Sequence, residues 1–535
     1  MKARALALIA AAALGGCGKN TALTLTILVP PNSDPFADAS TVEIALHGDN
    51  VTQAPATAMV SGGQFSASLE ITSPPRDNYV WLTVDARNGA GVVVGHARTP
   101  LFTLPSSDAQ VTVYVGRPGQ VTPTAVKLLD DSDTGATNMG RKFLAGAALR
   151  GQIATPLNAP SIGALIVGGL NDSGQPMAKA WLYSPTRHTL MSVQNPLTAR
   201  HGAVLVPSAD AQAGEQALLW GGASGAGQLY TSAENFDPSQ TSDPTQPAAT
   251  PQWAEPSPEV RDAGPPGAYL PAMAEPTDGV FVLTGGSSMA GDGPALAQAV
   301  LVQRTGGSAD TASKLGVTRL PPAIDGTGPL VVPRYQHSAS RATLPSGAGA
   351  LLFGGLSAAD AMAGKPVTEA FLADKKTFEA IILQPMQPES RRGHAAISLP
   401  SGKMLIIGGY LTDAPGPTTV QGSALLIDLN ARTYVVRDSF LRTPRYAASL
   451  TLINKDAMNK ELLLCGGFDP TGAPIADCEL FTSDDKLERI GNPIPLPHAR
   501  AGHLALQLET HQVLLVGGVG DGLRTVPDLD IYTDL

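Results

Sequence analysis

Seven arginines that recur through the last three-quarters of the chain are the side chains best suited to bind a ligand. A guanidinium group holds a carboxylate or phosphate through two parallel hydrogen bonds, so these residues could capture an anion. Alternatively, each arginine bonds carbonyl groups of a neighbouring repeat and is structural. The predicted binding residues are Arg150, Arg200, Arg261, Arg334, Arg392, Arg445 and Arg500.

Histidines close behind four of these arginines form a second candidate set: His201, His337, His394 and His503. They are either packing residues or groups that bind a ligand or transfer protons. The sequence has no HExxH, CxxC or GxSxG motif, and no GxGxxG motif follows a strand-like segment. We therefore predict no catalytic residue, no metal site and no cofactor.

Size and composition indicate a folded protein of more than one domain. The chain has 535 residues, of which 43% are hydrophobic and 15% are charged, so it can bury a large core. Its 57 glycines and 45 prolines favour frequent turns and disfavour long helices. The formal net charge of -10 argues against a nucleic-acid partner, because phosphates attract basic proteins.

An aliphatic run that ends in Gly-Gly recurs seven times and defines the repeats that carry the arginines. Its period, about 50 to 70 residues with four short strands in each unit, is typical of a β-propeller, in which each repeat forms one sheet or blade. The continuous apolar runs suit strands that are buried on both faces. The first glycines of the seven pairs are Gly168, Gly221, Gly285, Gly354, Gly408, Gly466 and Gly517.

The order of arginine-led strand, Gly-Gly strand and third strand resembles that of Kelch-repeat proteins over residues 146–535. The resemblance implies an all-β fold, a seven-bladed Kelch-type β-propeller, with the arginines near one mouth of its central channel. The seventh repeat stops at Leu535, just after its third strand. We expect residues 124–129 to supply its fourth strand and close the ring, because this removes an exposed sheet edge.

The first residues have the pattern of a secretion signal. Lys2 and Arg4 precede an apolar run over residues 5–14, which is too short to span a bilayer. The Leu-Gly-Gly-Cys sequence that ends at Cys17 resembles the lipobox of bacterial lipoproteins. This resemblance implies cleavage before Cys17, palmitate or other acyl chains on that residue and, with Gly18 in place of aspartate, an outer-membrane location on either face. An ordinary cleaved signal with a chance cysteine is the alternative.

The two other cysteines, Cys465 and Cys478, are predicted to form a disulfide. Lipidation of Cys17 leaves an even pair, and disulfides persist in an exported protein. The pair falls on the second and third strands of the sixth repeat, where side chains on adjacent strands can be close enough to bond. Two buried free thiols are the alternative.

Ahead of the repeats, apolar residues alternate with polar ones in short runs such as residues 42–46 and 80–84. This period of two, with turn residues between the runs, predicts an antiparallel β-sandwich of immunoglobulin-like architecture over residues 17–117. The predicted organisation is a signal peptide over 1–16, this sandwich, a linker over 118–145 and the propeller over 146–535.

Two functions from different classes fit these observations. The first is a lipid-anchored envelope protein whose propeller is a non-catalytic binding module for a protein, peptide or glycan, with the membrane contacted through the lipid. The alternative is a carbohydrate-active Kelch enzyme, such as a sugar epimerase or a galactose-oxidase-like oxidase. Convergence of histidine, carboxylate and tyrosine side chains from different repeats would favour the enzyme, whereas a mouth of arginines and small residues would favour binding.

Overall fold

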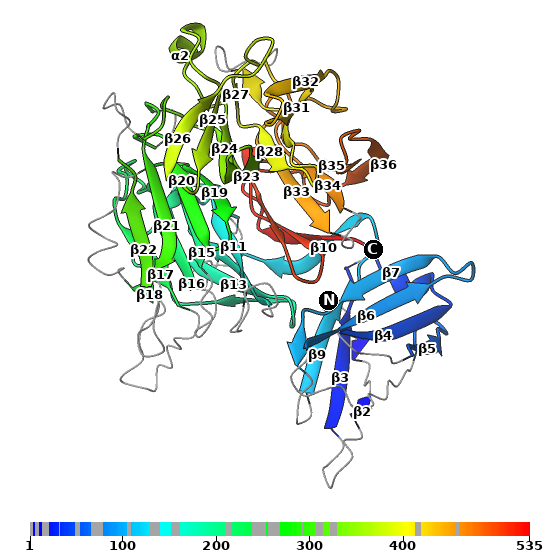
Figure 1. Ribbon diagram of the computed structural model, residues 1–535. Coiled ribbons are helices and arrows are strands. Elements are labelled where there is room, and N and C mark those ends of the chain that lie inside the picture. The colour runs from blue at the N-terminus through cyan, green and yellow to red at the C-terminus, as the bar shows by residue number, and fades with distance from the viewer. Residues whose placement is uncertain are drawn as a thin grey trace, which may run out of the picture.

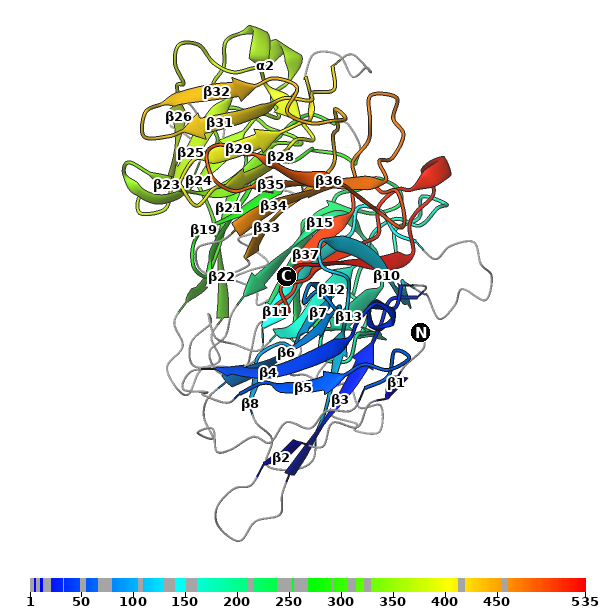
Figure 2. The same ribbon diagram turned by 90° about the vertical axis from the view of Figure 1, so that its right-hand side faces the viewer.

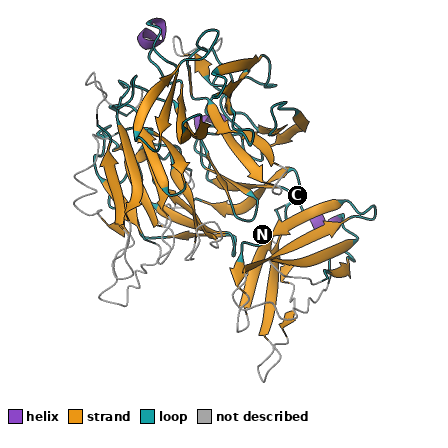
Figure 3. Cartoon of the chain, viewed as in Figure 1, coloured by secondary structure: helices purple, strands orange, loops and turns teal. Residues whose placement is uncertain are grey.

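The computed structural model describes most of the chain as strands (Figures 1 and 3). The described residues are 4–5, 10–12, 21–31, 33–48, 54–65, 79–103, 109–128, 140–150, 161–208, 216–237, 253–254, 268–290, 293–305, 314–321, 329–411, 419–454 and 460–535. Within these residues, no helix has both the length and the apolar character needed to cross a bilayer.

Two N-terminal sheets face each other across one apolar core. The first contains β1 (Arg4–Ala5), β2 (Ala10–Ala12), β3 (Thr21–Leu28) and β9 (Ala109–Tyr114). The second contains β4 (Thr41–Gly48), β5 (Ala56–Met59), β6 (Tyr79–Arg87), β7 (Val93–Arg98) and β8 (Phe102–Thr103), and the short helix η1 (Pro35–Ala37) precedes it. Leu25 and Val113 from the first sheet meet Ile44 and Leu82 from the second, because β4 and β6 bury every second residue.

One pairing in these sheets differs from the antiparallel arrangement predicted for residues 17–117. β3 and β9 run parallel, with Leu25 opposite Val111 and Ile27 opposite Val113. The prediction was wrong here because alternation identifies a strand and its buried face but carries no information about the direction of its partner.

Among the described residues of 120–533, seven four-stranded antiparallel sheets follow, numbered in chain order. Sheet 1 contains β11 (Ala145–Arg150), β12 (Ser161–Val167), β13 (Ala180–Ser184) and β14 (Thr189–Ser192). Sheet 2 contains β15 (His201–Ser208), β16 (Gln216–Ala223), β17 (Ala233–Phe236) and β18 (Trp253–Ala254). Sheet 3 contains β19 (Ala272–Thr277), β20 (Val280–Thr284), β21 (Ala299–Thr305) and β22 (Lys314–Arg319).

The remaining four sheets have the same order of strands. Sheet 4 contains β23 (Ser338–Leu344), β24 (Gly347–Phe353), β25 (Thr368–Leu372) and β26 (Thr377–Ile381). Sheet 5 contains β28 (Ala395–Ser398), β29 (Met404–Ile407), β31 (Ala424–Asp428) and β32 (Thr433–Arg437). Sheet 6 contains β33 (Ser449–Asn454), β34 (Lys460–Cys465), β35 (Asp477–Thr482) and β36 (Arg489–Pro495). Sheet 7 contains β37 (Leu504–Gln507), β38 (Val513–Val516), β39 (Asp528–Thr533) and β10 (Gln120–Lys127).

Four short elements of the described residues lie between these strands. β27 (Arg391–Arg392) lies just before β28 in the chain and pairs with β30 (Tyr410–Leu411), which lies between β29 and β31. The helix α2 (Ala358–Met362) lies between β24 and β25, and η3 (Asp521–Leu523) lies between β38 and β39. Both views place α2 at the end of the molecule far from the N-terminal sheets (Figures 1 and 2).

Each second strand is buried on both faces, as its continuous apolar sequence predicts. In β12, Leu165 packs in a cluster with Leu219 of sheet 2, whereas Ile166 packs in a cluster with Leu514 of sheet 7. Comparable clusters join sheets 2 and 3, 3 and 4, 4 and 5, 5 and 6, and 6 and 7. Every neighbouring pair of sheets, including the last and the first, therefore shares an apolar core.

The glycine pairs connect the same neighbours through the backbone. Both glycines of each pair have a left-handed φ, between 57° and 101°, which disfavours residues with a Cβ atom. The second glycine donates its N–H to a carbonyl oxygen of the next sheet in the series. The seven bonds are Gly169 to Arg200, Gly222 to Ala268, Gly286 to Arg334, Gly355 to Arg391, Gly409 to Arg445, Gly467 to Arg500 and Gly518 to Arg141.

Sheet 7 joins both ends of this region of the chain. β10 pairs antiparallel with β39, with Thr122 opposite Ile531, so residues from the segment before sheet 1 complete the last sheet as expected. The pairing begins at Gln120, ahead of the predicted residues 124–129. The Gln512 side chain donates to the carbonyl oxygen of Tyr114, 3.2 Å away, and so links sheet 7 to the N-terminal sheets.

Candidate functional site

A buried arginine precedes the first strand in six of the seven sheets. Its carbonyl oxygen is the acceptor of the glycine bond described above, so the same residue occupies the same place in each sheet. These residues are Arg141, Arg200, Arg334, Arg391, Arg445 and Arg500, and sheet 3 has Ala268 instead.

The guanidinium groups bind inside their own sheets. Arg334 donates from Nη1 to the carbonyl oxygens of Gly354 and Val367, at 2.6 and 2.8 Å. Its Nε and Nη2 both contact Glu369 Oε1, at 2.8 and 2.7 Å. In sheets 2, 4, 5, 6 and 7 the arginine Nη1 donates to the carbonyl oxygen of the first glycine of the pair. The arginine therefore fixes the glycine turn.

A buried carboxylate at one position of the third strand neutralises four of these arginines. In sheets 2, 4 and 6 it also accepts backbone N–H groups from the segment before the arginine; Glu369, for example, accepts from Val331 and Val332. The pairs are Arg200 with Glu234, Arg334 with Glu369, Arg445 with Glu479, and Arg500 with Asp530.

Four of the predicted binding residues, Arg200, Arg334, Arg445 and Arg500, therefore lie inside their sheets, and their binding of a ligand stays a prediction. Each is at most 1% exposed and already has a carboxylate partner, so a ligand anion has neither access nor an unmatched charge to bind. These contacts favour a structural role, but the guanidinium groups bond within their own sheets and the backbone carbonyls, not the side chains, contact the neighbouring sheet.

The other three predicted arginines do not occupy the arginine position. Arg150 ends β11, opposite Ser161 and at the far end of the strand from the glycine pair, while Arg141 occupies the position. Arg392 follows the buried Arg391 and is only partly buried. Arg261 lies outside the described residues.

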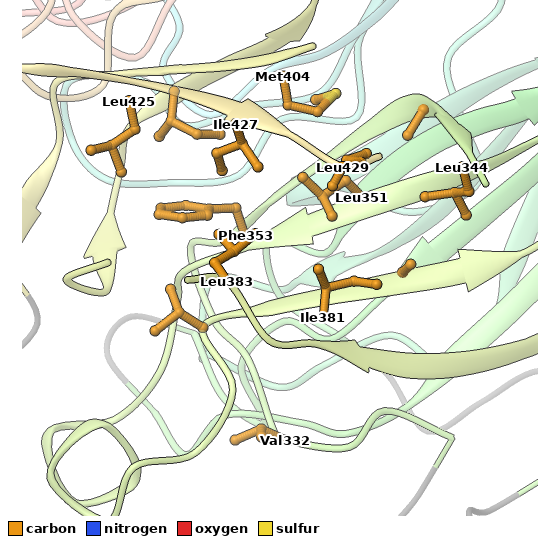
Figure 4. Close-up of a cluster of buried hydrophobic side chains, with 14 of the residues drawn as sticks. Val332, Leu344, Leu351, Phe353, Ile381, Leu383, Met404, Leu425, Ile427 and Leu429 are labelled. Carbon is orange, nitrogen blue, oxygen red and sulfur yellow. The ribbon is translucent and has the colours of Figure 1, made fainter. Parts of the chain in front are cut away.

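Sheet 5 keeps the buried arginine but lacks the carboxylate. The third-strand position is Leu425, which packs in an apolar cluster with Phe353 and Ile427 (Figure 4). Arg391 instead donates to the carbonyl oxygen of Gly408 and to both oxygens of Ser423. Burial lowers the pKa of Arg391 to about 10, since no carboxylate contacts the charge.

The two residues after the arginine position recur in all seven described sheets, and we call this set the inner rim. Its fourteen members are Lys142, Phe143, His201, Gly202, Tyr269, Leu270, Tyr335, Gln336, Arg392, Gly393, Tyr446, Ala447, Ala501 and Gly502. The second residue of each pair has a left-handed φ between 51° and 64°. These second residues also bond one another across sheets: Gly202 to Phe143, Leu270 to Gly202, Gly393 to Gln336, Ala447 to Gly393, and Gly502 to Ala447. The backbone of the inner rim is thus fixed by contacts between sheets.

The side chains of Lys142, Arg392 and Phe143 extend from this backbone. Lys142 is partly buried, and the described residues provide no hydrogen-bond or ion-pair partner for its ammonium group. Arg392 donates from Nε and Nη2 to the carbonyl oxygen of Leu356, at 3.3 and 3.0 Å, which leaves its Nη1 for other partners. Phe143 is 36% exposed.

Aromatic and amide side chains surround these groups. The ring of Phe143 lies 6.4 Å from the rings of both His201 and Tyr269. Beside sheets 4 and 5, Tyr410, which pairs with Arg392, donates its hydroxyl to Gln336 Oε1. The inner rim therefore offers positive charge, aromatic surface and neutral hydrogen-bonding groups together, a combination suited to recognition of a polar or anionic ligand.

Three of the four candidate histidines are packing residues between sheets. Nε2 lies 2.8 Å from a hydroxyl of the preceding sheet in each case: His337 with Thr284, His394 with Ser338, and His503 with Ser449. Burial lowers the pKa values of His394 and His503 to about 3 and that of His337 well below its usual value, so all three are neutral at pH 7. His201 is the exception, since it belongs to the inner rim.

Cys465 and Cys478 form a disulfide between the second and third strands of sheet 6, as predicted. Both residues are buried, and they lie directly opposite each other in the register. Cys17, the predicted lipidation site, lies outside the described residues.

The residues that give the inner rim its character were not predicted from the sequence. Arg391 could have been distinguished from Arg392 by the Arg-x-x-His spacing that Arg334 and Arg500 also show. Acidic residues inside apolar third strands, such as Glu369, were a further signal for a buried partner. Nothing in the local sequence marks Lys142 or Phe143, because their role depends on the ring.

The comparisons with known proteins add no relative. No protein-family model matches this sequence, and no curated protein matches it. Among the described residues, no three histidine, cysteine, aspartate or glutamate side chains are grouped so that they could hold a metal ion.

Proposed function

We propose that this chain is a lipid-anchored protein of the cell envelope whose seven sheets are the blades of a Kelch-type β-propeller. In this proposal the propeller is a non-catalytic binding module for a protein, peptide or glycan, and the inner rim is its recognition surface. The N-terminal sheets, an immunoglobulin-like sandwich in this proposal, connect the propeller to the anchor at Cys17.

The observation that supports a closed ring of blades is the series of seven glycine bonds. It passes once through every sheet and returns from Gly518 to Arg141. The apolar clusters follow the same order, including the one that joins sheets 7 and 1. Kelch repeats share the glycine pair and the arginine-led first strand, which supports placing the chain in that class.

The observation that supports binding is the chemistry of the inner rim. Lys142 and Arg392 project charge from a backbone fixed by bonds between sheets, in a protein with a formal net charge of -10. A rigid scaffold that presents unmatched donors loses little conformational freedom when a ligand binds. The three inter-sheet histidines are neutral and committed to hydroxyl partners, so they support the architecture rather than proton transfer.

Recognition at the inner rim is tested with the soluble form, residues 18–535, on arrays of glycans and peptides that contain matched acidic and neutral members. We expect acidic members to bind and the double variant Lys142→Ala/Arg392→Ala to lose at least tenfold in affinity. The matched control is Lys375→Ala/Arg437→Ala, which removes two exposed cations elsewhere. Equal affinities of the two double variants would remove the inner rim from the proposal.

The lipid anchor is tested separately by growing an expressing bacterium with an alkyne-bearing palmitate and analysing the N-terminal peptide by mass spectrometry. The expected peptide begins at an acylated Cys17, and a Cys17→Ser variant should carry no label. An unlabelled wild-type protein that begins at another residue would contradict the anchor but leave the binding proposal intact.

A further inference from the structure

A pocket beside α2 is lined by none of the inner-rim residues. The pocket, of about 280 Å³, opens between the segment that contains α2, the segment before β27, and β30. Met362 and Lys365 line it from the first segment, Gln387 and Glu389 from the second, and Leu411 from β30. Its volume lies near the lower limit of ligand pockets, roughly 300 Å³, so it suits a small group or a short segment.

The side-chain amide of Gln387 has no partner in this pocket. Both Oε1 and Nε2 are shielded from solvent, and neither has a hydrogen bond to any described residue. Leaving a shielded donor or acceptor unpaired destabilises the folded protein, and native proteins keep few such groups. The unpaired amide of Gln387 destabilises the free protein. A ligand that supplies its hydrogen-bond partners would explain why it is there.

The other walls of the pocket narrow the choice of ligand. Leu411 and Val367 give it an apolar side, and Met362, which is 79% exposed, is a flexible apolar side chain at its edge. Lys365 and Glu389 are exposed and place opposite charges on the lining. The pocket therefore combines one amide, one apolar surface and one charge of each sign.

We propose that this pocket binds a short peptide segment whose main-chain amide pairs with the side-chain amide of Gln387. A peptide group offers one N–H donor and one C=O acceptor, which match the Oε1 acceptor and the Nε2 donor of the carboxamide. A side chain of the peptide packs against Leu411, and the charged ends of the segment face Lys365 and Glu389. The Gln387 side chain turns toward the ligand as it enters.

The variant Gln387→Leu distinguishes a binding role from a structural one. Leucine removes both unpaired atoms and fills a similar space, so the free protein should be at least as resistant to urea as the wild type. Peptide binding should weaken by about tenfold or more because the amide pair is lost. Gln175→Leu, at an exposed position between the second and third strands of sheet 1, is the control and should change neither property.

The probes are the dipeptide Ala-Leu and, as a sugar with the same secondary amide, N-acetylglucosamine. Each is titrated to about 10 mM, because small ligands of this kind bind in the millimolar range, into residues 18–535 labelled with 15N-glutamine. A shift of the Gln387 side-chain amide with Ala-Leu, absent in Gln387→Leu, supports the proposal. A shift with N-acetylglucosamine alone overturns the peptide assignment. No shift with either probe, or a loss of urea resistance in Gln387→Leu, overturns the site.

Discussion

Replacing Arg334 and Arg392 by alanine in separate variants should have very different effects, although the two arginines looked equivalent in sequence. Arg334 is fully buried and uses all three nitrogens. Its loss leaves the Glu369 carboxylate buried without its cation. It also removes the N–H groups that donate to the carbonyl oxygens of Gly354, Val367 and Pro366. Arg392 is partly buried and has a single carbonyl partner.

These contacts set the size of the two effects. Removing one member of a buried ion pair destabilises a protein by about 3 to 5 kcal/mol, because the remaining charge stays buried. Removing a partly exposed arginine that makes one hydrogen-bonding contact costs about 1 kcal/mol. With a denaturant slope of about 3 kcal/mol/M, the Arg334→Ala midpoint should fall by about 1 M urea or more, and the Arg392→Ala midpoint by about a third of that.

The measurement is urea unfolding of residues 18–535 followed by tryptophan fluorescence. A chain of this size can unfold through intermediates, so the first transition is compared between variants. Arg334→Lys serves as a control that keeps the charge but loses the planar contacts, and its midpoint should lie between those of the wild type and Arg334→Ala. Equal midpoints for Arg334→Ala and Arg392→Ala would refute the assignment of Arg334 to the scaffold.

Three further outcomes test other parts of the structure. Gly408→Val should prevent folding, because φ is 64° at this glycine and a Cβ atom would lie 2.4 Å from the carbonyl oxygen of Arg445. Gly89→Val is the control, since a Cβ atom there would meet open space. A soluble Gly408→Val protein with an unchanged circular dichroism spectrum would contradict the turn. Burial and then the charge of Arg500 lower the pKa of His503 to about 3, against about 6.5 in the unfolded chain, so its contribution to stability is complete above pH 6.5 and is lost as pH falls toward 3. His503→Gln should therefore reduce the loss of unfolding free energy between about pH 7.5 and about pH 5 by about 2 kcal/mol, and an identical pH dependence would count against that pKa. Replacing Cys465 and Cys478 by alanine should lower the free energy of unfolding by about 3 kcal/mol, because the unfolded chain is no longer constrained by a closed loop of this length. A urea midpoint equal to that of the oxidised wild type would show that the disulfide does not stabilise the protein.

The architecture was accessible from the sequence because its signals are local. Apolar runs such as Leu405-Ile406-Ile407 are continuous because both faces of the second strand are buried. The glycine pair that follows marks a backbone turn that other residues rarely adopt. The strand supplied by β10 could be predicted because the seventh repeat has three strands and an unpaired edge is unfavourable.

The site was less accessible because it depends on contacts between repeats. Arg150 stands at a plausible distance before its glycine pair, yet it lies at the wrong end of the first strand. Spacing alone cannot show whether an arginine begins or ends a strand. Lys142 and the exposed Phe143 acquire their place from the preceding buried Arg141 and from the left-handed residues that bond between sheets, which no single repeat reveals.

The parallel pair β3 and β9 determines how the molecule would resist a pulling force. β3 begins at Thr21 and runs toward the seven sheets, where Leu28 packs in the cluster shared by sheets 7 and 1, and β9 runs alongside it and leads directly into β10. Tension between a tether ahead of Thr21 and a load on the seven sheets would pull the two strands lengthwise in opposite directions. All the hydrogen bonds between them would then be loaded at once, in shear, instead of opening one after another like a zipper. Such a joint resists rupture, which suits a protein held at one end and pulled at the other.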